Sequence, residues 1–404
     1  MKTTHKIRAV FTIIALSSSF SIAQDADQTE MQKRILLRSA TAKGNTTRIQ
    51  NVLTKAMNKE PLVIGVIGGS ITEGAAASRY QNQYGHLVAD WFKATFPKTP
   101  ITYINAGIGA TSSNMGTHRV DDTLLRHKPD LVICEYAVND NGNSHILETM
   151  EGLVRQVLKS EKQPALILFF MCDQKGKNEQ DKHILIGKHY DLPMISFRDA
   201  LYPEIEAGTI KWEDIEADAV HPNDRGHRYG AELITDYVQK ILDSMPESPK
   251  IKPIEELPKP ITSNPFEYTT MFCTRTSVAA MNKGWITTDD RGPYRQFFGN
   301  GWLSEKPGST LEFDIKGTSL SLVYHLDKQK DYGMIQVQVD DREPEKHSAY
   351  VGWIWDGGMC VWKPVASDLA YGWHKIKITL LDEKDKDSTG TRFRLMAVMA
   401  SGRN

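Results

Sequence analysis

Hydrophobic residues in the first part of the chain alternate between two patterns. Short apolar runs bounded by glycine or polar residues predict buried strands at residues 62–67, 101–104, 131–136, 165–171 and 194–196. Between these runs the apolar residues recur at helical spacing, as they do in residues 84–92 and 233–241. Strands that alternate with helices favour a parallel sheet covered on both faces. We therefore expect an α/β domain over residues 60–243, preceded by an extension over residues 24–59 whose polar, basic part, residues 33–59, predicts one exposed helix.

The pattern changes after residue 243. Six prolines fall within residues 244–265 and predict a stiff linker or an extended strap. Beyond them the apolar residues recur at every second position, which is the period of a half-buried strand. The runs are Leu311, Phe313, Ile315; Leu320, Leu322, Tyr324; Ile335, Val337, Val339; Ile376, Ile378, Leu380; and Phe393, Leu395. Residues 266–404 should therefore form an antiparallel β-sandwich or jelly roll.

The first 23 residues have the features of a secretory signal peptide. Lys2, Lys6 and Arg8 precede an apolar run over residues 9–16, and small residues follow before Gln24. The apolar run is shorter than the roughly 20 residues that a membrane span requires. No cysteine follows the small residues, so a lipid anchor is not supported. We expect a secreted or periplasmic protein that is not inserted in a membrane after cleavage.

Composition excludes some partners and leaves the disulfide question open. Lysines and arginines total 49 against 50 acidic residues, so neither nucleic acid nor an acidic membrane surface is favoured as a partner. Of the four cysteines, Cys134 lies in a predicted strand and Cys172 at the end of another, where each should be a small buried hydrophobe. Cys273 and Cys360 share the C-terminal region and are candidates for a disulfide, which exported proteins permit. Their separation in space does not follow from the sequence.

Candidate catalytic residues follow the ends of the predicted strands. The first strand ends in two glycines and delivers Ser70 onto a turn, where a hydroxyl needs a base and an oxyanion pocket to act as a nucleophile. His221 can supply the base, with Asp218, three residues earlier, orienting its ring. Gly109 can offer a backbone N–H and Asn139 a side-chain amide, each after another strand. In open parallel sheets, catalytic groups gather at these strand ends.

Each of these signals has a structural alternative when it stands alone. Ser70 could simply cap a helix, and a histidine before Pro222 could be an ordinary turn residue. Together with Asp218 and His221, the nearby Asp224 and His227 could be read as metal ligands. Their spacing around Pro222, however, matches no common set of ligands. We expect no metal, and we expect His227 and Asp224 to cap and brace the last helix of the α/β domain.

Taken together and in this order, the four blocks around Ser70, Gly109, Asn139 and His221 resemble those of the SGNH (GDSL-like) hydrolases. The resemblance covers about residues 60–243 and implies a flavodoxin-like, three-layer domain. It also implies that Ser70 is the nucleophile, that His221 and Asp218 complete a triad, and that the Ser70 N–H, Gly109 and Asn139 bind the oxyanion. No cofactor is implied. Two departures, glycine before the serine and alanine two residues before Asn139, are similar to those of members that act on polysaccharides.

Tryptophans are concentrated in the second domain, which carries six of the eight. Such rings either fill a core or stack on sugars, because a flat ring offers a large contact area. Trp353 and Trp355 precede an Asp-Gly-Gly turn and are candidate substrate-binding residues near the surface. Trp212, shortly before the histidine block, is a candidate pocket wall or a packing residue.

These features lead to an expected function and two alternatives. The resemblance, the export signal and the tryptophans favour a serine esterase that removes O-acetyl groups from a polysaccharide or oligosaccharide of the xylan, xyloglucan or pectin type. A lipid or aryl esterase, including a lysophospholipase, is an alternative, although no lid-like apolar segment favours it. A carbohydrate-binding protein without activity is another, but such a protein has no need of the complete catalytic set.

Overall fold

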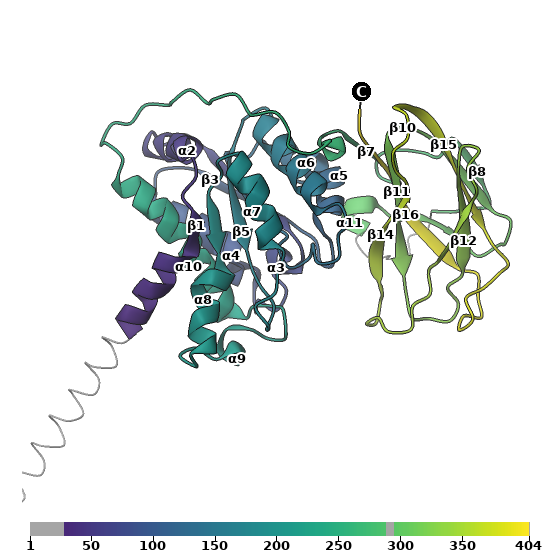
Figure 1. Ribbon diagram of the computed structural model, residues 1–404, viewed down its shortest axis with the longest axis horizontal. Helices are drawn as coiled ribbons and strands as arrows, with labels where there is room; N and C mark the ends of the chain where they lie inside the picture. Colours follow the sequence, from purple (N-terminus) through teal and green to yellow (C-terminus); the bar gives the residue numbers. More distant parts are fainter. Residues whose placement is uncertain (1–27, 288–294, 404) are drawn as a thin grey trace, which may run out of the picture.

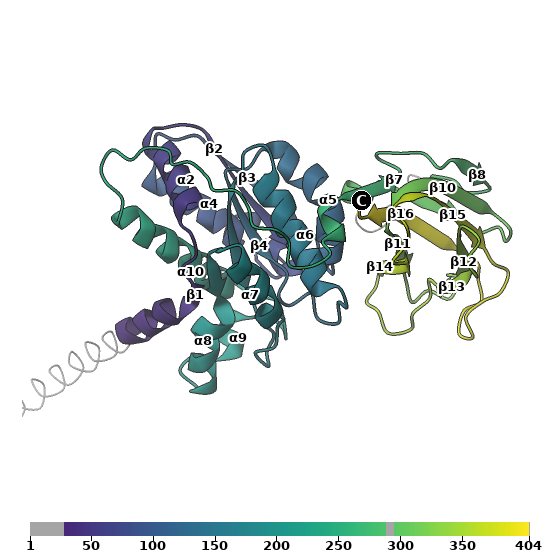
Figure 2. The ribbon, with the colours of Figure 1, turned by 45° about the horizontal axis from the view of Figure 1, so that its top comes forward.

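The computed structural model describes residues 28–287 and 295–403. The predicted signal peptide, residues 1–23, lies outside the described residues. Figure 1 shows an α/β domain joined by an extended segment to a β-sandwich, and Figure 2 shows the same two bodies side by side from another direction. An α/β domain followed by an antiparallel β domain confirms the predicted fold class.

The sheet of the first domain has the strand order β1-β6-β5-β4-β2-β3. Strands β2 to β6 are parallel, and β1 pairs with β6 in the antiparallel direction. The chain winds in opposite directions on the two sides of the boundary between β2 and β4, which is where open α/β sheets bind ligands. The strands are β1 Ala40–Ala42, β2 Leu62–Gly68, β3 Ile101–Gly107, β4 Leu131–Glu135, β5 Ala165–Phe170 and β6 Met194–Ser196.

Helices cover both faces of this sheet and create two cores. Successive residues of β5 alternate between them, with Phe169 in one core and Phe170 in the other. One face is covered by α2 Thr47–Met57, α4 Tyr84–Thr95, α8 Phe197–Glu206 and α10 Asp224–Asp243. The other is covered by α5 Ser113–Thr123, α6 Ile146–Lys159 and α7 Gln180–His189. Short helices complete the domain: α3 Ser70–Glu73, η1 Tyr80–Asn82, η2 Leu125–His127 and α9 Trp212–Ile215.

The prediction of one exposed helix over residues 33–59 is wrong. The structure has two helices, residues 28–39 and α2, with β1 between them. Helix α2 buries Ile49, Val52, Leu53 and Ala56 in the first core, a spacing that places them on one helix face. The basic residues around this apolar stripe obscured it in the sequence.

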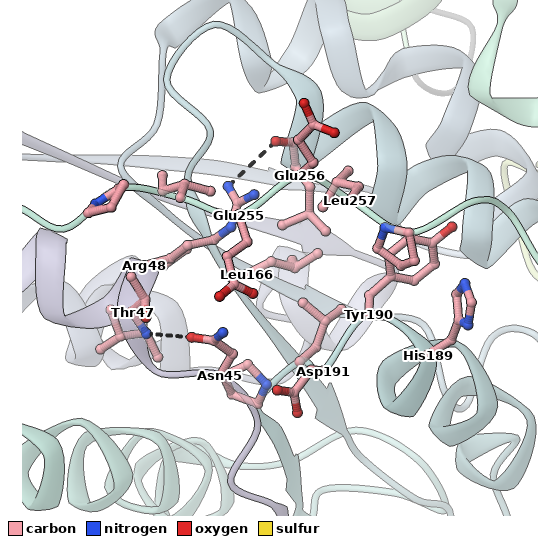
Figure 3. Close-up of a pocket in the computed structure, with 18 residues that line it drawn as sticks. Asn45, Thr47, Arg48, Leu166, His189, Tyr190, Asp191, Glu255, Glu256 and Leu257 are labelled. Carbon is pink, nitrogen blue, oxygen red and sulfur yellow. Dashed lines mark hydrogen bonds between the residues drawn. The ribbon is translucent and has the colours of Figure 1, made fainter.

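Residues 244–265 form an extended strap along the α/β domain (Figures 1 and 2). The backbone of Lys252 both donates to and accepts from the side-chain amide of Asn51 on α2, at 2.8 and 2.9 Å. Beneath the strap lies a cavity of about 180 Å³, and Figure 3 shows residues that line it, among them Arg48, Tyr190 and Glu255. Because Leu166 at the start of β5 also lines it, this cavity lies at the opposite end of the sheet from Ser70.

The second domain is a sandwich of two antiparallel sheets, as the alternating pattern predicted. One sheet has the order β13-β12-β15-β10-β8, and the other has β14-β11-β16-β7 with β9 also paired to β16. Its strands are β7 Thr269–Cys273, β8 Met281–Lys283, β9 Trp302–Ser304, β10 Thr310–Gly317, β11 Ser319–Leu326, β12 Met334–Val339, β13 Glu345–Ser348, β14 Met359–Ala366, β15 Gly372–Leu380 and β16 Phe393–Ser401. Two short helices, η3 Pro265–Glu267 and α11 Arg295–Phe298, lie toward the α/β domain (Figure 1).

The two domains share a packed interface. Met115 of α5 lies in a buried cluster formed otherwise by the second domain, including Cys273 and Cys360. Glu267 of η3 forms ion pairs with Arg155 and Lys159 of α6. Since the interface combines an apolar cluster with buried charge pairs, it fixes the orientation of the sandwich.

Two further findings concern the cysteines of the α/β domain and its helices. Cys134 and Cys172 are buried, as predicted. Within residues 28–287 and 295–403, no helix combines the length and the apolar character needed to cross a bilayer.

Candidate active site

Ser70 follows the C-terminal end of β2 on a turn that only small residues can form. A Cβ atom on Gly68 would lie 2.1 Å from the Thr72 hydroxyl oxygen and 2.4 Å from the Glu135 carbonyl oxygen. The absence of a side chain therefore lets the chain turn directly from β2 into α3, with Ser70 as the first residue of that helix.

The structure brings Ser70, His221 and Asp218 into one hydrogen-bonded relay. His221 Nε2 lies 2.9 Å from Ser70 Oγ, and His221 Nδ1 lies 2.8 Å from Asp218 Oδ2. A carboxylate beside Nδ1 favours the tautomer that is protonated there, which leaves Nε2 free to accept the serine proton. Residues separated by about 150 positions thus have the geometry of an activated nucleophile.

The loop that carries Asp218 and His221 is held by its own backbone. Asp218 Oδ1 accepts the N–H groups of Val220 and His221 at 2.7 and 2.9 Å, which explains why the two catalytic candidates are three residues apart. Partial burial would raise the pKa of Asp218, but these bonds and the one to the His221 ring outweigh it and lower the pKa. Asp218 is therefore a carboxylate at neutral pH.

Trp212 supports the same loop through a hydrogen bond to its backbone. Its indole N–H donates to the Asp218 carbonyl oxygen at 2.7 Å, and the ring is buried. Of the two roles expected for Trp212, packing therefore agrees with this buried position better than contact with the substrate.

Glu216, at the start of the loop, is buried and its carboxylate oxygens have no hydrogen-bond partner among the described residues. Burial, with a smaller contribution from the charge of Asp218, raises the pKa of Glu216 to about 9. At neutral pH a protonated carboxyl group therefore lies beneath the catalytic loop.

Asn139 follows β4 and lies against the nucleophile turn. A Cβ on Gly69 would lie 2.1 Å from Asn139 Oδ1, 2.5 Å from Cγ and 2.9 Å from Nδ2. The side-chain amide therefore occupies the space that a side chain at position 69 would need. This explains why glycine precedes the serine here, and it places Asn139 beside Ser70 as the sequence predicted.

Gly109 also lies next to the nucleophile, but its N–H is occupied. It donates to Glu73 Oε2 at 2.8 Å, and a Cβ on Gly109 would lie 3.8 Å from Ser70 Cβ. The next residue, Ala110, has a left-handed backbone with φ of 53°. The turn after β3 is thus adjacent to Ser70, with a neighbouring carboxylate that the sequence reasoning did not consider.

Sequence reasoning missed two buried supports of the site. His183 Nε2 lies 2.9 Å from Asp140 Oδ2, and both side chains are buried. The Arg119 guanidinium donates to the Gly68 carbonyl at 3.0 Å and to the Tyr136 hydroxyl at 2.8 Å. The positions of these side chains depend on packing between distant elements, so no local pattern indicates them.

Of the prediction that Asp224 and His227 cap and brace the last helix, the capping part is wrong. Asn223 caps α10 by accepting the Arg225 and Gly226 N–H groups. Asp224 instead accepts from the backbone and hydroxyl of Ser78, at 2.8 and 2.6 Å, and so braces the loop after α3. His227 is buried, and its Nδ1 accepts the Tyr84 N–H at 3.3 Å.

The tryptophans of the sandwich divide between core and surface. Trp285 and Trp302 are buried in its core, whereas Trp353 and Trp355 are 78% and 54% exposed. The buried Ile354 lies between the exposed pair and anchors their loop. The buried His325 also holds this loop, through a hydrogen bond of 3.0 Å between its Nε2 and the Gly357 carbonyl oxygen. Two aromatic rings are therefore presented to solvent on a loop with a fixed backbone.

The α/β domain is similar to a known protein family. A model of the GDSL-like Lipase/Acylhydrolase family matches residues 66–229. Among curated proteins, the thioesterase 1/protease 1/lysophospholipase L1 of Escherichia coli K12 is 23% identical over 188 residues, which covers 45% of this chain and 83% of that protein. The family match lies within the α/β domain.

A solved structure matches both domains together. A two-domain esterase active on acetylated mannans superposes with a TM-score of 0.83 at 30% identity, covering 91% of this chain and 99% of that one. A crystal of a two-domain esterase active on acetylated mannans with mannopentaose gives a TM-score of 0.82 at 31% identity, over 91% of this chain and 98% of that one. The similarity therefore extends to the sandwich and to its orientation on the α/β domain.

Proposed function

We propose that this chain, which belongs to the GDSL-like lipase/acylhydrolase family and is a carboxylic ester hydrolase, removes O-acetyl groups from a polysaccharide through an acyl-enzyme formed on Ser70. The observation that carries the proposal is the relay of hydrogen bonds from Asp218 through His221 to Ser70, at 2.8 and 2.9 Å. This arrangement lies at the carboxyl ends of the strands, where α/β enzymes bind substrates.

The proposed reaction has two steps. Ser70 Oγ attacks the acetyl carbonyl carbon while His221 Nε2 takes its proton, and the protonated ring then returns this proton to the departing sugar oxygen. Water, activated by the same nitrogen, next attacks the acyl-enzyme and releases acetate. Asp218 holds the ring and stabilises its protonated form throughout, and no metal or organic cofactor takes part.

The tetrahedral oxyanion would be bound by donors from three strand ends. These are the N–H of Ser70, the Asn139 side-chain amide and the turn at Gly109. Fixed donors in a partly desolvated site stabilise developing charge without reorganisation, and one such donor contributes about 10²- to 10³-fold in kcat.

For the substrate we propose acetylated mannan before the xylan, xyloglucan or pectin expected from the sequence. The support is the two-domain esterase active on acetylated mannans, whose similarity extends over 91% of this chain. The export signal expected from the sequence agrees with a polymer that is met outside the cytoplasm.

Trp353 and Trp355 are the proposed contacts to the glycan chain. Exposed rings on an anchored loop stack on sugar faces with little loss of entropy. Replacing both by alanine should raise KM for polymeric substrate several-fold and leave hydrolysis of p-nitrophenyl acetate unchanged. Replacement of Trp373, which is also exposed but lies on strand β15 and not on this loop, is the matched control.

Acetate release from acetylated mannan, xylan, xyloglucan and pectin tests the proposal, with the wild type and Ser70→Ala measured together. Release from mannan that is lost in the variant is expected. Equal release by both proteins would refute the role of Ser70. A wild type that cleaves long-chain aryl or lysophospholipid esters but no acetylated glycan would instead support a lipid esterase.

A further inference from the structure

The carboxylate of Glu73 lies beside the proposed nucleophile without a place in the reaction described above. Glu73 is the last residue of α3, the helix that begins with Ser70. Its Oε2 accepts the Gly109 N–H at 2.8 Å and lies at the same distance from the position of a Cβ on Gly109. One short helix therefore carries both the nucleophile and a carboxyl group that occupies a neighbouring backbone donor.

The turn after β3 presents a second backbone donor. Ala110 adopts φ of 53°, a region that alanine rarely enters, and such strain is concentrated at functional sites. A left-handed residue in a turn directs successive N–H groups into one concavity, which binds anions. Ala110 is partly exposed, and no acceptor for its N–H lies among the described residues. The concavity thus has one N–H held by Glu73 and one available.

The remaining bonds fix this turn. The Ile108 N–H donates to the Gly68 carbonyl at 3.1 Å, and the Thr111 hydroxyl donates to the Ile108 carbonyl at 2.7 Å. The Glu73 carboxylate adds the bond that ties the middle of the turn to α3. An oxyanion that used the Gly109 N–H would have to displace the Glu73 oxygen from it in every catalytic cycle.

We infer that Glu73 is a positioning residue that holds the Gly109 N–H, so that the N–H of Ala110 is the donor that this turn offers to the oxyanion. The inference rests on the proposed function. It assigns the Ala110 N–H, and not the Gly109 N–H, as the third donor to the oxyanion. Glu73 acts through the backbone that it holds and does not contact the reacting atoms.

Kinetics of Glu73 variants give the first test. Glu73→Ala should lower kcat for p-nitrophenyl acetate about 10- to 100-fold with KM nearly unchanged, because a loosened donor affects the transition state most. Glu73→Gln keeps an oxygen acceptor and should restore most of the loss. Glu213→Ala, at an exposed glutamate of α9, is the matched control and should behave as wild type.

A purely structural role for Glu73 would lower Tm without this change in kcat. A Glu73→Ala variant as active as the wild type, or more active, would overturn the inference, since the carboxylate would then be idle or obstructive.

The crystal structure of the wild type with Ser70 phosphonylated by a methylphosphonate ester gives the second test. The phosphonyl oxygen should lie within about 2.7–3.1 Å of the Ala110 nitrogen, with Glu73 still bound to the Gly109 N–H. An oxygen bound to Gly109, with Glu73 displaced, would refute the inference and leave the proposed function intact. Failure of Ser70 to react at all would refute the proposed function itself.

Discussion

A methyl group at position 69 should inactivate the enzyme by displacing Asn139. The added Cβ would lie 2.1 Å from Asn139 Oδ1, whereas real Cβ contacts are essentially never shorter than 3.0 Å. Clearing this overlap requires a shift of about 1 Å, and such a shift takes an N–H···O bond beyond hydrogen-bonding distance. Since Asn139 Cγ and Nδ2 are also closer than 3.0 Å, rotation of the amide in place does not relieve the overlap.

Gly69→Ala should therefore cost what the loss of one oxyanion donor costs, about 10²- to 10³-fold in kcat or about 2.7–4 kcal/mol. The assay is hydrolysis of p-nitrophenyl acetate by Gly69→Ala, by Asn139→Ala and by the double variant, with Tm as the control for folding. Because both single changes remove the same donor, the double variant should be no slower than Asn139→Ala alone. Full activity of Gly69→Ala would refute the reasoning, and losses that add in the double variant would show that the alanine acts elsewhere.

Three further predictions concern the relay, the buried carboxyl group and the interface. Asp218→Asn should lower kcat about 10²- to 10⁴-fold with little change in Tm, because the amide no longer holds the proton-accepting tautomer of His221; unchanged kcat would exclude Asp218 from the relay. The pKa of Glu216 is raised from 4.5 to about 9, so the folded state retains a proton that the unfolded chain releases, and stability falls as pH rises between these values. Urea unfolding between pH 6 and 8 should show Glu216→Gln losing less stability than wild type, by up to about 1.4 kcal/mol per pH unit, and parallel curves would contradict the burial of this group. Met115→Ala should destabilise the protein by about 2–5 kcal/mol in denaturant unfolding, whereas Leu185→Ala, at an exposed position, should change stability by less than about 0.5 kcal/mol.

The sequence predicted those parts of the fold and site that depend on local patterns. The parallel strands and the β-sandwich follow from apolar periodicity, and the nucleophile turn follows from two glycines before a serine. Asp218 and His221 were recognisable because they lie three residues apart on one loop, a spacing that the bonds from Asp218 to the backbone of Val220 and His221 explain.

Other parts depend on contacts between distant segments. The bond from Gly109 to Glu73 and the pair of Asp140 with His183 join elements whose relative placement only the folded sheet determines. The burial of α2 was missed for a different reason, because basic residues around its apolar stripe lowered the average hydrophobicity of the segment.

The packed interface between the domains has a consequence for how a polymer would be handled. A binding domain on a flexible tether lets its enzyme search many positions along a chain that stays bound. Here Met115 and the Glu267 ion pairs hold the sandwich in one orientation, and the strap is itself fixed to α2. A glycan bound at Trp353 would therefore meet Ser70 at a constant number of sugar units from that ring. Such an enzyme would remove acetyl groups at a fixed distance from the bound sugar, and the spacing of the deacetylated positions would reveal that distance.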